Sequence, residues 1–148
     1  FPTVEDALAV EPGRVKVMAS CWSPPGWMKQ NGSELGMYNN VKGTLKTSKY
    51  QAYANYITKF IQNYESRGID IYAITPNNEP DHASYDWPAL PMSHTQAQTL
   101  VADYLRPTLT QNGIDAKILC WDPAIPPPIT ERVLILWNFT KTQMLGMR

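Results

Sequence analysis

The chain has 148 residues, of which 43% are hydrophobic, and its 13 acidic and 13 basic side chains leave it without net charge. This composition is typical of one ordinary globular domain or of part of a larger one. The chain has neither a polybasic block nor an acidic bias, which excludes nucleic acid and anionic membranes as expected partners; neutral partners such as sugars fit better.

Signals for membranes, secretion and metals are sparse. No apolar run reaches the roughly 18 residues that a membrane-spanning helix needs, so we expect no membrane span. Residues 1–20 lack the pattern of a signal peptide. A signal peptide that was removed before Phe1 stays an open alternative. Cys21 and Cys120 are predicted on non-adjacent strands and form neither a disulfide framework nor a metal site. His82 and His94 lack the spacing of metal ligands, so no metal is expected.

A short helix and a strand are predicted at the start of the chain. Residues 4–10 have the pattern of a helix end, and the Pro-Gly pair after them stops it. Residues 15–20 form a β-prone run that enters an aromatic and proline-rich loop at residues 21–29. The polar, glycine-bearing stretch that follows, as far as Lys46, is predicted as one long loop.

The clearest helix comes next. Apolar residues recur at helical intervals from Tyr50 to Tyr64 and predict one inward face, on which the tyrosines serve as packing residues. Ser48 and Gln51 have the spacing of a capping box at the start of this helix, and Gly68 marks its end.

A second amphipathic helix is predicted further along the chain. Ser93 and Gln96 repeat the capping-box spacing, the apolar face runs through residues 97–105, and Gly113 follows the end. Pro107 is expected to bend or interrupt this helix, because it has no backbone N–H and crowds the preceding turn.

Two further strands complete the pattern. Residues 69–75 form an apolar run and residues 116–121 a third β-prone run, so strand, loop and helix alternate with strands about fifty residues apart. This alternation predicts right-handed βαβ units, a parallel sheet and an α/β fold. The richest loops follow strands, where such folds place their active sites, and Tyr85, Trp87 and Trp121 are candidates to reach a cleft there.

Glu79 is the candidate catalytic acid. It follows a strand predicted to be buried and stands between Pro76 and Pro80. Pro76 has a fixed φ, and Pro80 biases Glu79 toward an extended backbone, so the carboxyl group is expected on stiff chain. Stiffness suits acid catalysis, which needs a proton within hydrogen-bond reach of the leaving oxygen. The alternative is a solvated loop carboxylate or an ion-pair partner.

Three motifs stand in a fixed order: Ser-Cys-Trp-Ser-Pro-Pro-Gly-Trp-Met-Lys at residues 20–29, the pair Tyr53 and Ala54, and Thr-Pro-Asn-Asn-Glu-Pro at residues 75–80. Together they resemble glycoside hydrolase family 30, the glucosylceramidase-like group. The Asn-Glu-Pro tripeptide alone is a weak signal, but preceded at this distance by the tryptophan loop it is strong. The resemblance covers roughly residues 4–125.

The resemblance implies a (β/α)8 TIM barrel, of which this chain, residues 1–148, is a fragment that supplies about strands 3 to 5 with their helices. Family members are retaining β-glycosidases that need no cofactor. Carried over by motif, Glu79 is the acid/base, Asn78 hydrogen-bonds the sugar 2-hydroxyl, and Trp22 forms a wall of the subsite for the reacting sugar. The nucleophilic glutamate has no counterpart in this chain, so the chain alone is expected to be inactive.

Alternatives stay open for the binding residues. Asn78 can instead tie down its own turn, and Trp22 can be a core residue, as we expect Trp27 to be. Cys21 stands where the family usually has proline, which is expected to loosen the Trp22 loop. Residues 129–148 form an atypical tail, which we interpret as a frameshifted read of a longer gene.

The expected function is hydrolysis of a β-linked glucoside, such as glucosylceramide or β-1,6-glucan, or of xylan, with a carbohydrate or glycolipid as partner. A non-catalytic carbohydrate-binding protein and an inactive structural remnant are the alternatives. The expected location is extracellular or a lysosome-like compartment, and nothing indicates the oligomeric state. Asn31-Gly32-Ser33 and Asn138-Phe139-Thr140 fit N-glycosylation acceptors, which matter only in a secreted chain.

Overall fold

The computed structural model of the chain describes residues 2–10, 13–120 and 136–137. Two 3₁₀ turns, at Gly26–Met28 and Thr47–Lys49, accompany the regular elements. In chain order, the helices and strands are α1 (Pro2–Val10), β1 (Val17–Ser20), β2 (Met37–Tyr38), β3 (Val41–Lys42), α2 (Tyr50–Glu65), β4 (Ile71–Thr75), α3 (His94–Thr99), a π-helical segment (Leu100–Leu105), α4 (Arg106–Gln111), β5 (Lys117–Leu119) and β6 (Leu136–Trp137).

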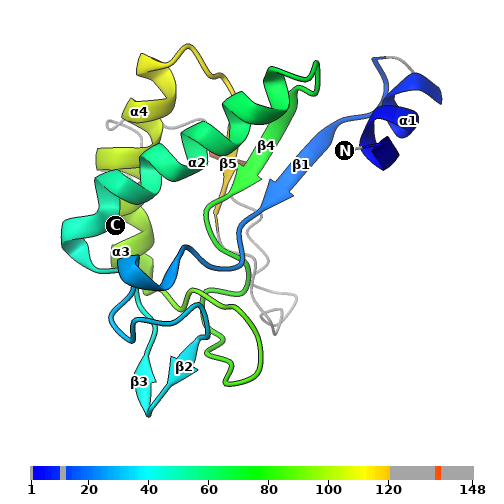
Figure 1. The fold of residues 1–148 in the computed structure, drawn as a ribbon. Coiled ribbons are helices and arrows are strands. Elements are labelled where there is room, and N and C mark those ends of the chain that lie inside the picture. Colours follow the sequence, from blue (N-terminus) through cyan, green and yellow to red (C-terminus); the bar gives the residue numbers. More distant parts are fainter. Residues whose placement is uncertain (1, 11–12, 121–135, 138–148) are drawn as a thin grey trace, which may run out of the picture.

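The predicted parallel sheet is confirmed. Strand β4 pairs in parallel with β1 on one side and with β5 on the other. Helix α2 connects β1 to β4, and α3 and α4 connect β4 to β5, so the chain forms two successive βαβ units (Figure 1). Strand β6, within the tail at residues 129–148, pairs antiparallel with β5, which was not predicted. The remainder of that tail and Trp121 lie outside the described residues.

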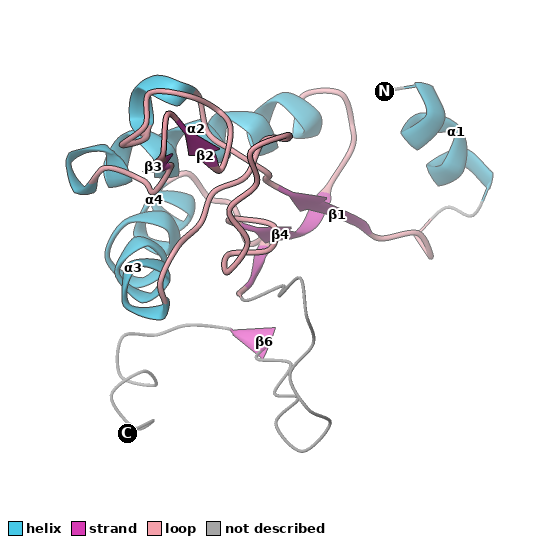
Figure 2. Cartoon of the chain, turned by 90° about the horizontal axis from the view of Figure 1, so that it is seen from below, coloured by secondary structure: helices cyan, strands magenta, loops and turns pink. Residues whose placement is uncertain are grey.

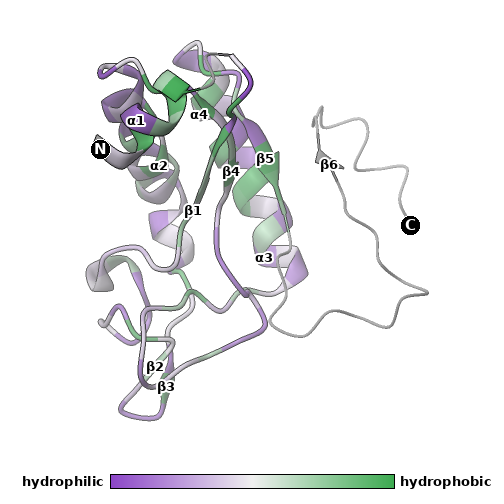
Figure 3. Ribbon diagram, turned by 90° about the vertical axis from the view of Figure 1, so that its right-hand side faces the viewer, coloured by the Kyte–Doolittle hydropathy of each residue, from purple (hydrophilic) through white to green (hydrophobic). Residues whose placement is uncertain are grey.

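Helices cover one face of this sheet. Seen from below, α2, α3 and α4 lie on the same side of β1 and β4 (Figure 2). The register between β1 and β4 shifts at Tyr72, which is the extra residue of a bulge, and both Ile71 and Ile74 therefore reach the core. Met18 and Tyr72 stay 58% and 38% exposed. Hydrophobic residues concentrate in the strands and the adjoining helices, whereas the end with β2 and β3 is mostly hydrophilic (Figure 3).

The helix predicted from Tyr50 onward is confirmed as α2, but its predicted cap is wrong. Lys49 is the N-cap residue and makes no side-chain cap hydrogen bond. The Gln51 amide donates instead to the Thr108 hydroxyl of α4, at 2.9 Å, so it ties two helices together. Gly68, with a φ of 77°, ends the chain reversal after α2 as predicted.

The second helix carries both predicted features. Ser93 and Gln96 form a reciprocal capping box, with bonds of 3.3 and 2.9 Å. Pro107, which lacks the N–H that would continue the ladder, distorts the helix without ending it, since helical residues run without a gap from His94 to Gln111. The Arg106 N–H consequently reaches back five positions to the Val101 carbonyl, and the turns before it widen into the π-helical segment.

The long loop predicted as far as Lys46 is wrong in part, because β2 and β3 form an antiparallel hairpin within it. Asn39 and Asn40 connect the strands with φ of 49° and 61°. Asparagine tolerates this left-handed conformation, and two such residues in a row make the tight turn that hairpins favour. The hairpin lies beyond the ends to which the arrows of β1 and β4 point (Figure 1).

The Asn31 side chain is hydrogen-bonded within its own loop. Its amide nitrogen donates to the Leu35 carbonyl at 2.9 Å, and its amide oxygen accepts the Ser33 N–H at 3.1 Å. Asn138 lies outside the described residues, and in the described ranges no helix is long and apolar enough to cross a membrane.

Candidate active site

The tryptophan loop and the segment that carries Glu79 lie side by side at the carboxyl ends of two neighbouring strands. The Cys21 N–H donates to the Thr75 carbonyl at 3.3 Å, and the Asn78 N–H donates to the Cys21 carbonyl at 2.7 Å. These two bonds extend the ladder between β1 and β4 beyond the strands themselves. They bring the backbones of Trp22 and Glu79 to the same edge of the sheet, where parallel α/β folds place their sites.

Glu79 does not have the extended backbone that Pro80 predicts. Its φ is 45°, in the left-handed region, and its carbonyl accepts the His82 N–H at 3.0 Å to close a turn. The chain reverses directly after β4, and this turn imposes the positive φ on Glu79. Glutamate disfavours a positive φ, and a residue before proline disfavours helical conformations in general. Strained backbone of this kind is concentrated at functional sites.

Two buried side chains fix the segment that carries Glu79 through hydrogen bonds. The Tyr53 hydroxyl of α2 donates to the Pro76 carbonyl, and the Asn77 amide donates to the Leu90 carbonyl at 3.1 Å. Tyr53 is fully buried, and this burial raises the pKa of Tyr53 well above its usual range, so the hydroxyl remains a donor. The predicted packing role is confirmed for Tyr53, which in addition donates this hydrogen bond.

Replacing Tyr53 with phenylalanine is expected to destabilise the protein by about 1–2 kcal/mol, because the buried Pro76 carbonyl loses its hydroxyl donor. Denaturant unfolding of the variant measures this loss. Tyr56→Phe is the matched control: Tyr56 lies on the same helix but is 43% exposed, so we expect a change within about 0.5 kcal/mol. Equal losses in the two variants would show that the Pro76 contact contributes nothing.

Cys21 ties its loop to the neighbouring strand. Its N–H makes the bond to Thr75 that a proline at this position cannot make. Burial raises the pKa of the Cys21 thiol, so it stays neutral beside Tyr53. Burial also raises the pKa of Cys120 to about 11, and β4 separates the strands that precede the two cysteines, which are both free.

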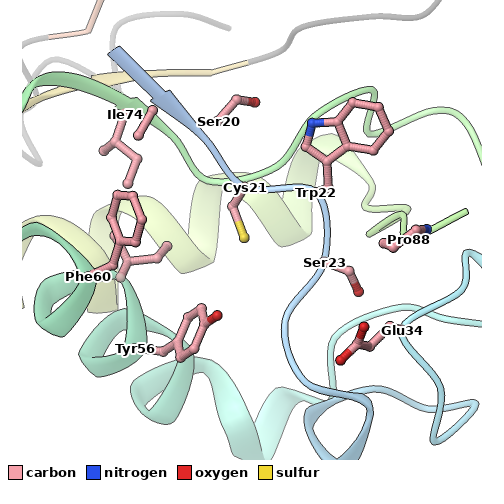
Figure 4. Close-up of a pocket in the computed structure, with 11 residues that line it drawn as sticks. Ser20, Cys21, Trp22, Ser23, Glu34, Tyr56, Phe60, Ile74 and Pro88 are labelled. Carbon is pink, nitrogen blue, oxygen red and sulfur yellow. The ribbon is translucent and has the colours of Figure 1, made fainter. Parts of the chain in front are cut away.

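A pocket of about 370 Å³ opens between the end of β1 and helix α2. Its lining includes residues 20–23 from the β1 end, Tyr56 and Phe60 from α2, and Glu34 and Pro88 from two loops (Figure 4). Phe60, predicted on the inward face of α2, is 36% exposed in this pocket. The pocket therefore combines aromatic rings with hydroxyl and carboxyl groups, a mixture that suits a sugar.

Trp22 is a surface residue of this pocket rather than a core residue. It is 50% exposed, and its side chain is one of those that line the pocket (Figure 4). Glu79 and Asn78 do not line this pocket, although their backbone adjoins the Trp22 loop. Trp27, predicted to be in the core, is 55% exposed, with the Lys49 ammonium 5.4 Å from its ring centre.

Sequence reasoning assigned no role to Lys29, whose ammonium group holds the loops around this site together. The residue is fully buried. Its three N–H groups are shared among four oxygen atoms: the Ser23 hydroxyl at 2.9 Å from Nζ, and the carbonyls of Glu34, Leu35 and Ala89 at 2.7, 2.8 and 2.7 Å. The tryptophan loop, the segment before β2 and the loop after β4 therefore converge on one charge. The position of this lysine, directly after Trp-Met in the motif, was the sequence feature that could have indicated a structural role.

The buried ammonium predicts a pH dependence of stability. Burial lowers the pKa of Lys29 to about 8, although the Glu34 carboxylate opposes the shift. Between about pH 8 and 10.5, the ordinary pKa of a lysine, the unfolded chain therefore binds more protons than the folded chain. Lys29 consequently makes the free energy of unfolding rise with pH in that window. Unfolding free energies of wild type and Lys29→Met, measured from pH 7 to 10.5, should show this rise as a difference. A difference that does not vary with pH would contradict the lowered pKa.

The assembled residues offer proton donation and contacts to a ring. Within residues 2–10 and 13–120, no group of three His, Cys, Asp or Glu side chains could hold a metal ion. Glu79 supplies a carboxyl group on a constrained turn, Asn78 an amide beside it, and Trp22 an exposed indole. A positioned carboxyl group is what acid-assisted cleavage of a glycosidic bond requires at the leaving oxygen.

Comparisons with known proteins agree with this fold. Residues 1–125 match the Glycosyl hydrolase family 30 TIM-barrel domain. The chain is 34% identical over 117 residues to the endo-1,6-beta-D-glucanase neg1 of Aspergillus fumigatus, which covers 73% of this chain and 24% of that protein. It is 30% identical over 121 residues to the putative glucosylceramidase 4 of Caenorhabditis elegans, covering 80% of this chain and 23% of that protein.

A solved structure shows the same arrangement. SrfJ from Salmonella typhimurium superposes with a TM-score of 0.74 at 33% identity, covering 82% of this chain and 26% of SrfJ. The chain thus spans about a quarter of the length of the relatives that it matches. The similarity confirms a partial TIM barrel, with β1, β4 and β5 as consecutive barrel strands.

Proposed function

This chain belongs to glycosyl hydrolase family 30, and on that premise we propose that the protein containing it is a retaining β-glycosidase with Glu79 as its acid/base. The observation that supports this role best is the ladder extension that sets the backbone of Glu79 beside the Trp22 loop. In the proposed mechanism, the Glu79 carboxyl group protonates the leaving oxygen, and then, as a carboxylate, it deprotonates the attacking water.

The proposed mechanism needs a second carboxylate about 5 to 5.5 Å from the first, which attacks the anomeric carbon and forms the glycosyl-enzyme intermediate. We propose that a segment other than residues 1–125 supplies this nucleophile. Asn78 is proposed to hydrogen-bond the 2-hydroxyl of the reacting sugar, and Trp22 to form one wall of its subsite. The protein is proposed to need no cofactor for this chemistry.

The proposed substrate is a β-linked glucoside. Two relatives support this class by their names, since one is an endo-1,6-beta-D-glucanase and the other a putative glucosylceramidase. The pocket beside Trp22, with its aromatic and hydroxyl lining, is compatible with either substrate. A secreted or lysosome-like location is part of the same proposal and can be checked by fractionation of the source cells.

Hydrolysis by the complete gene product tests the proposal. β-1,6-Glucan, glucosylceramide and xylan are offered in parallel, and the anomer released first is identified by NMR. We expect turnover of a β-glucoside with retention of configuration. Release of the inverted anomer would contradict the two-step mechanism, and binding of all three substrates without hydrolysis would favour a carbohydrate-binding protein instead.

A further inference from the structure

Two lysines lie on the face of the sheet that points away from α2, α3 and α4 (Figure 2). Successive side chains of a strand point to opposite faces of a sheet. Val17 packs against the core under the helices, so Lys16 before it lies on the opposite face. Ile118 is fully buried in the same core, so Lys117 before it lies on that opposite face as well. Both lysine side chains are exposed in this chain.

Tyr72 of β4 joins the two ammonium groups. Lys117 Nζ is 4.3 Å from the centre of the Tyr72 ring and donates a hydrogen bond to its hydroxyl group. Lys16 Nζ is 5.4 Å from the same ring centre. The three side chains come from the amino ends of three neighbouring strands, since β4 runs between β1 and β5. The cluster of Lys16, Tyr72 and Lys117 is therefore at the opposite end of the sheet from Glu79.

This cluster has positive charge and hydrogen-bond donors in excess. In the described part of the chain, the contacts of both ammonium groups go to Tyr72, and neither group reaches a carboxylate. An ammonium group has three N–H donors and no acceptor. The Tyr72 hydroxyl accepts one of these donors and keeps its own O–H as a further donor. What the cluster lacks is an acceptor with negative charge.

The face that carries the cluster becomes the interior of a closed barrel. In a TIM barrel the helices form the outer ring, and the inward side chains of the strands fill the interior in layers. Strands β1, β4 and β5 are consecutive strands of such a barrel, and the chain spans about a quarter of the length of its relatives. Two ammonium groups enclosed without a counter-charge would be strongly destabilising, because a buried charge must be paired.

We propose that an inward-facing aspartate or glutamate, on a barrel strand outside residues 1–125 of the complete protein, pairs with the cluster of Lys16, Tyr72 and Lys117. A carboxylate has two oxygen atoms, which can accept from both ammonium groups and from the Tyr72 hydroxyl. The pair fixes this part of the barrel to the remainder. Its carboxylate is distinct from the proposed nucleophile, which belongs at the carboxyl ends of the strands. The inference rests on the barrel fold and not on the proposed hydrolysis.

Thermal unfolding of the complete gene product tests this pairing. Lys117→Met keeps most of the side-chain volume but leaves the enclosed carboxylate without one of its partners, so we expect the melting temperature to fall by roughly 5 to 10 °C. Lys117→Glu should lower it further, because it places a like charge beside the carboxylate. The matched controls are Lys59→Met and Lys59→Glu, since Lys59 is an exposed lysine on the outer helix α2. Both should stay within about 2 °C of wild type.

The pH dependence of the loss identifies the carboxylate. In Lys117→Met, the enclosed carboxylate takes up a proton as the pH falls, which removes the cost of an unpaired charge. The difference in melting temperature between wild type and Lys117→Met should therefore shrink from about pH 7 to about pH 4. A difference that is the same at both ends of this range would mean that Lys117 contributes only its contact with Tyr72, and the proposal would be wrong.

Two other outcomes would also overturn the proposal. If both Lys117 variants match the Lys59 controls, the cluster is solvated in the complete protein. If Lys117→Met raises the melting temperature, Lys117 is enclosed without a carboxylate. Should Lys117→Glu give no folded protein, Lys117→Met and its pH dependence decide the question alone. Absence of hydrolysis by the wild type would contradict the proposed function but not this pairing.

Discussion

Replacing Glu79 with glutamine is expected to slow hydrolysis of a β-linked gluco-oligosaccharide by the complete gene product by roughly 10²- to 10⁴-fold. Glutamine has almost the same shape as glutamate but no carboxyl proton to transfer. Because the φ of 45° at this position is already imposed by the turn, the new side chain leaves the backbone as it is. Steady-state kinetics with the oligosaccharide measure the effect on kcat.

The leaving group reveals whether proton donation is what the substitution removes. A sugar leaving group needs a proton, whereas fluoride departs with little help. Glu79→Gln should therefore lower kcat/KM, which reports the first step alone, far more for the oligosaccharide than for the matching glycosyl fluoride. The second step, in which Glu79 acts as the base, is common to both substrates and lowers kcat for both. Asp81→Asn is the matched control, since Asp81 is an exposed carboxylate two residues further along the same turn. If both substitutions cost the same, or if Glu79→Gln lowers kcat/KM equally for both substrates, Glu79 is not the acid.

Replacing Lys29 with methionine is expected to destabilise the protein by at least about 3 kcal/mol, since four buried or half-buried oxygen atoms lose their common donor. Methionine fills a similar volume, so the loss of hydrogen bonds dominates. The loops that meet at Nζ carry Trp22 at one end and Trp87 at another, and both should become mobile. Denaturant unfolding measures the stability, and hydrogen exchange of residues 33–36 and 84–89 measures the loop order.

A second lysine nearby provides the comparison. Lys46 Nζ donates a single exposed bond of 3.1 Å to the Trp27 carbonyl, so Lys46→Met should change stability by no more than about 0.5 kcal/mol. Lys29→Arg keeps the charge but not the fit, because Lys29 Cε already lies 2.8 Å from the place where a Cβ on Gly43 would be. We therefore expect partial loss with arginine. Full stability in Lys29→Met would mean that the loops are held by other contacts.

Periodicity and local signals predicted most elements correctly. Both long helices, the three parallel strands and the capping box at Ser93 followed from spacing, because burial repeats and cap bonds involve residues three or four positions apart. The box at Ser48 failed because Gln51 donates to Thr108 on another helix. The β2–β3 hairpin was missed although Asn39 and Asn40 were its signal, since strands of two residues have no readable period.

The motifs proposed residues for the site but did not predict their surroundings. Glu79, Asn78 and Trp22 were proposed because their residue types stand in a recognisable order along the chain. The burial of Lys29 was not predicted, since lysine is ordinarily exposed and only the meeting of three loops surrounds it with oxygen atoms. The positive φ of Glu79 was missed for a related reason, because the neighbouring proline favours the opposite and the turn overrides it.

By itself, the sequence determined the order of the three parallel strands and the long helices, because these depend on residues that are close together in the chain, and its motifs determined membership of the family. Only the tertiary structure decided which loops surround Glu79, the proposed acid. The reason is the register of β1 against β4: Ser20 and Thr75, 55 positions apart, meet at a hydrogen bond of 2.7 Å, and every contact between the tryptophan loop and the Glu79 turn follows from that alignment.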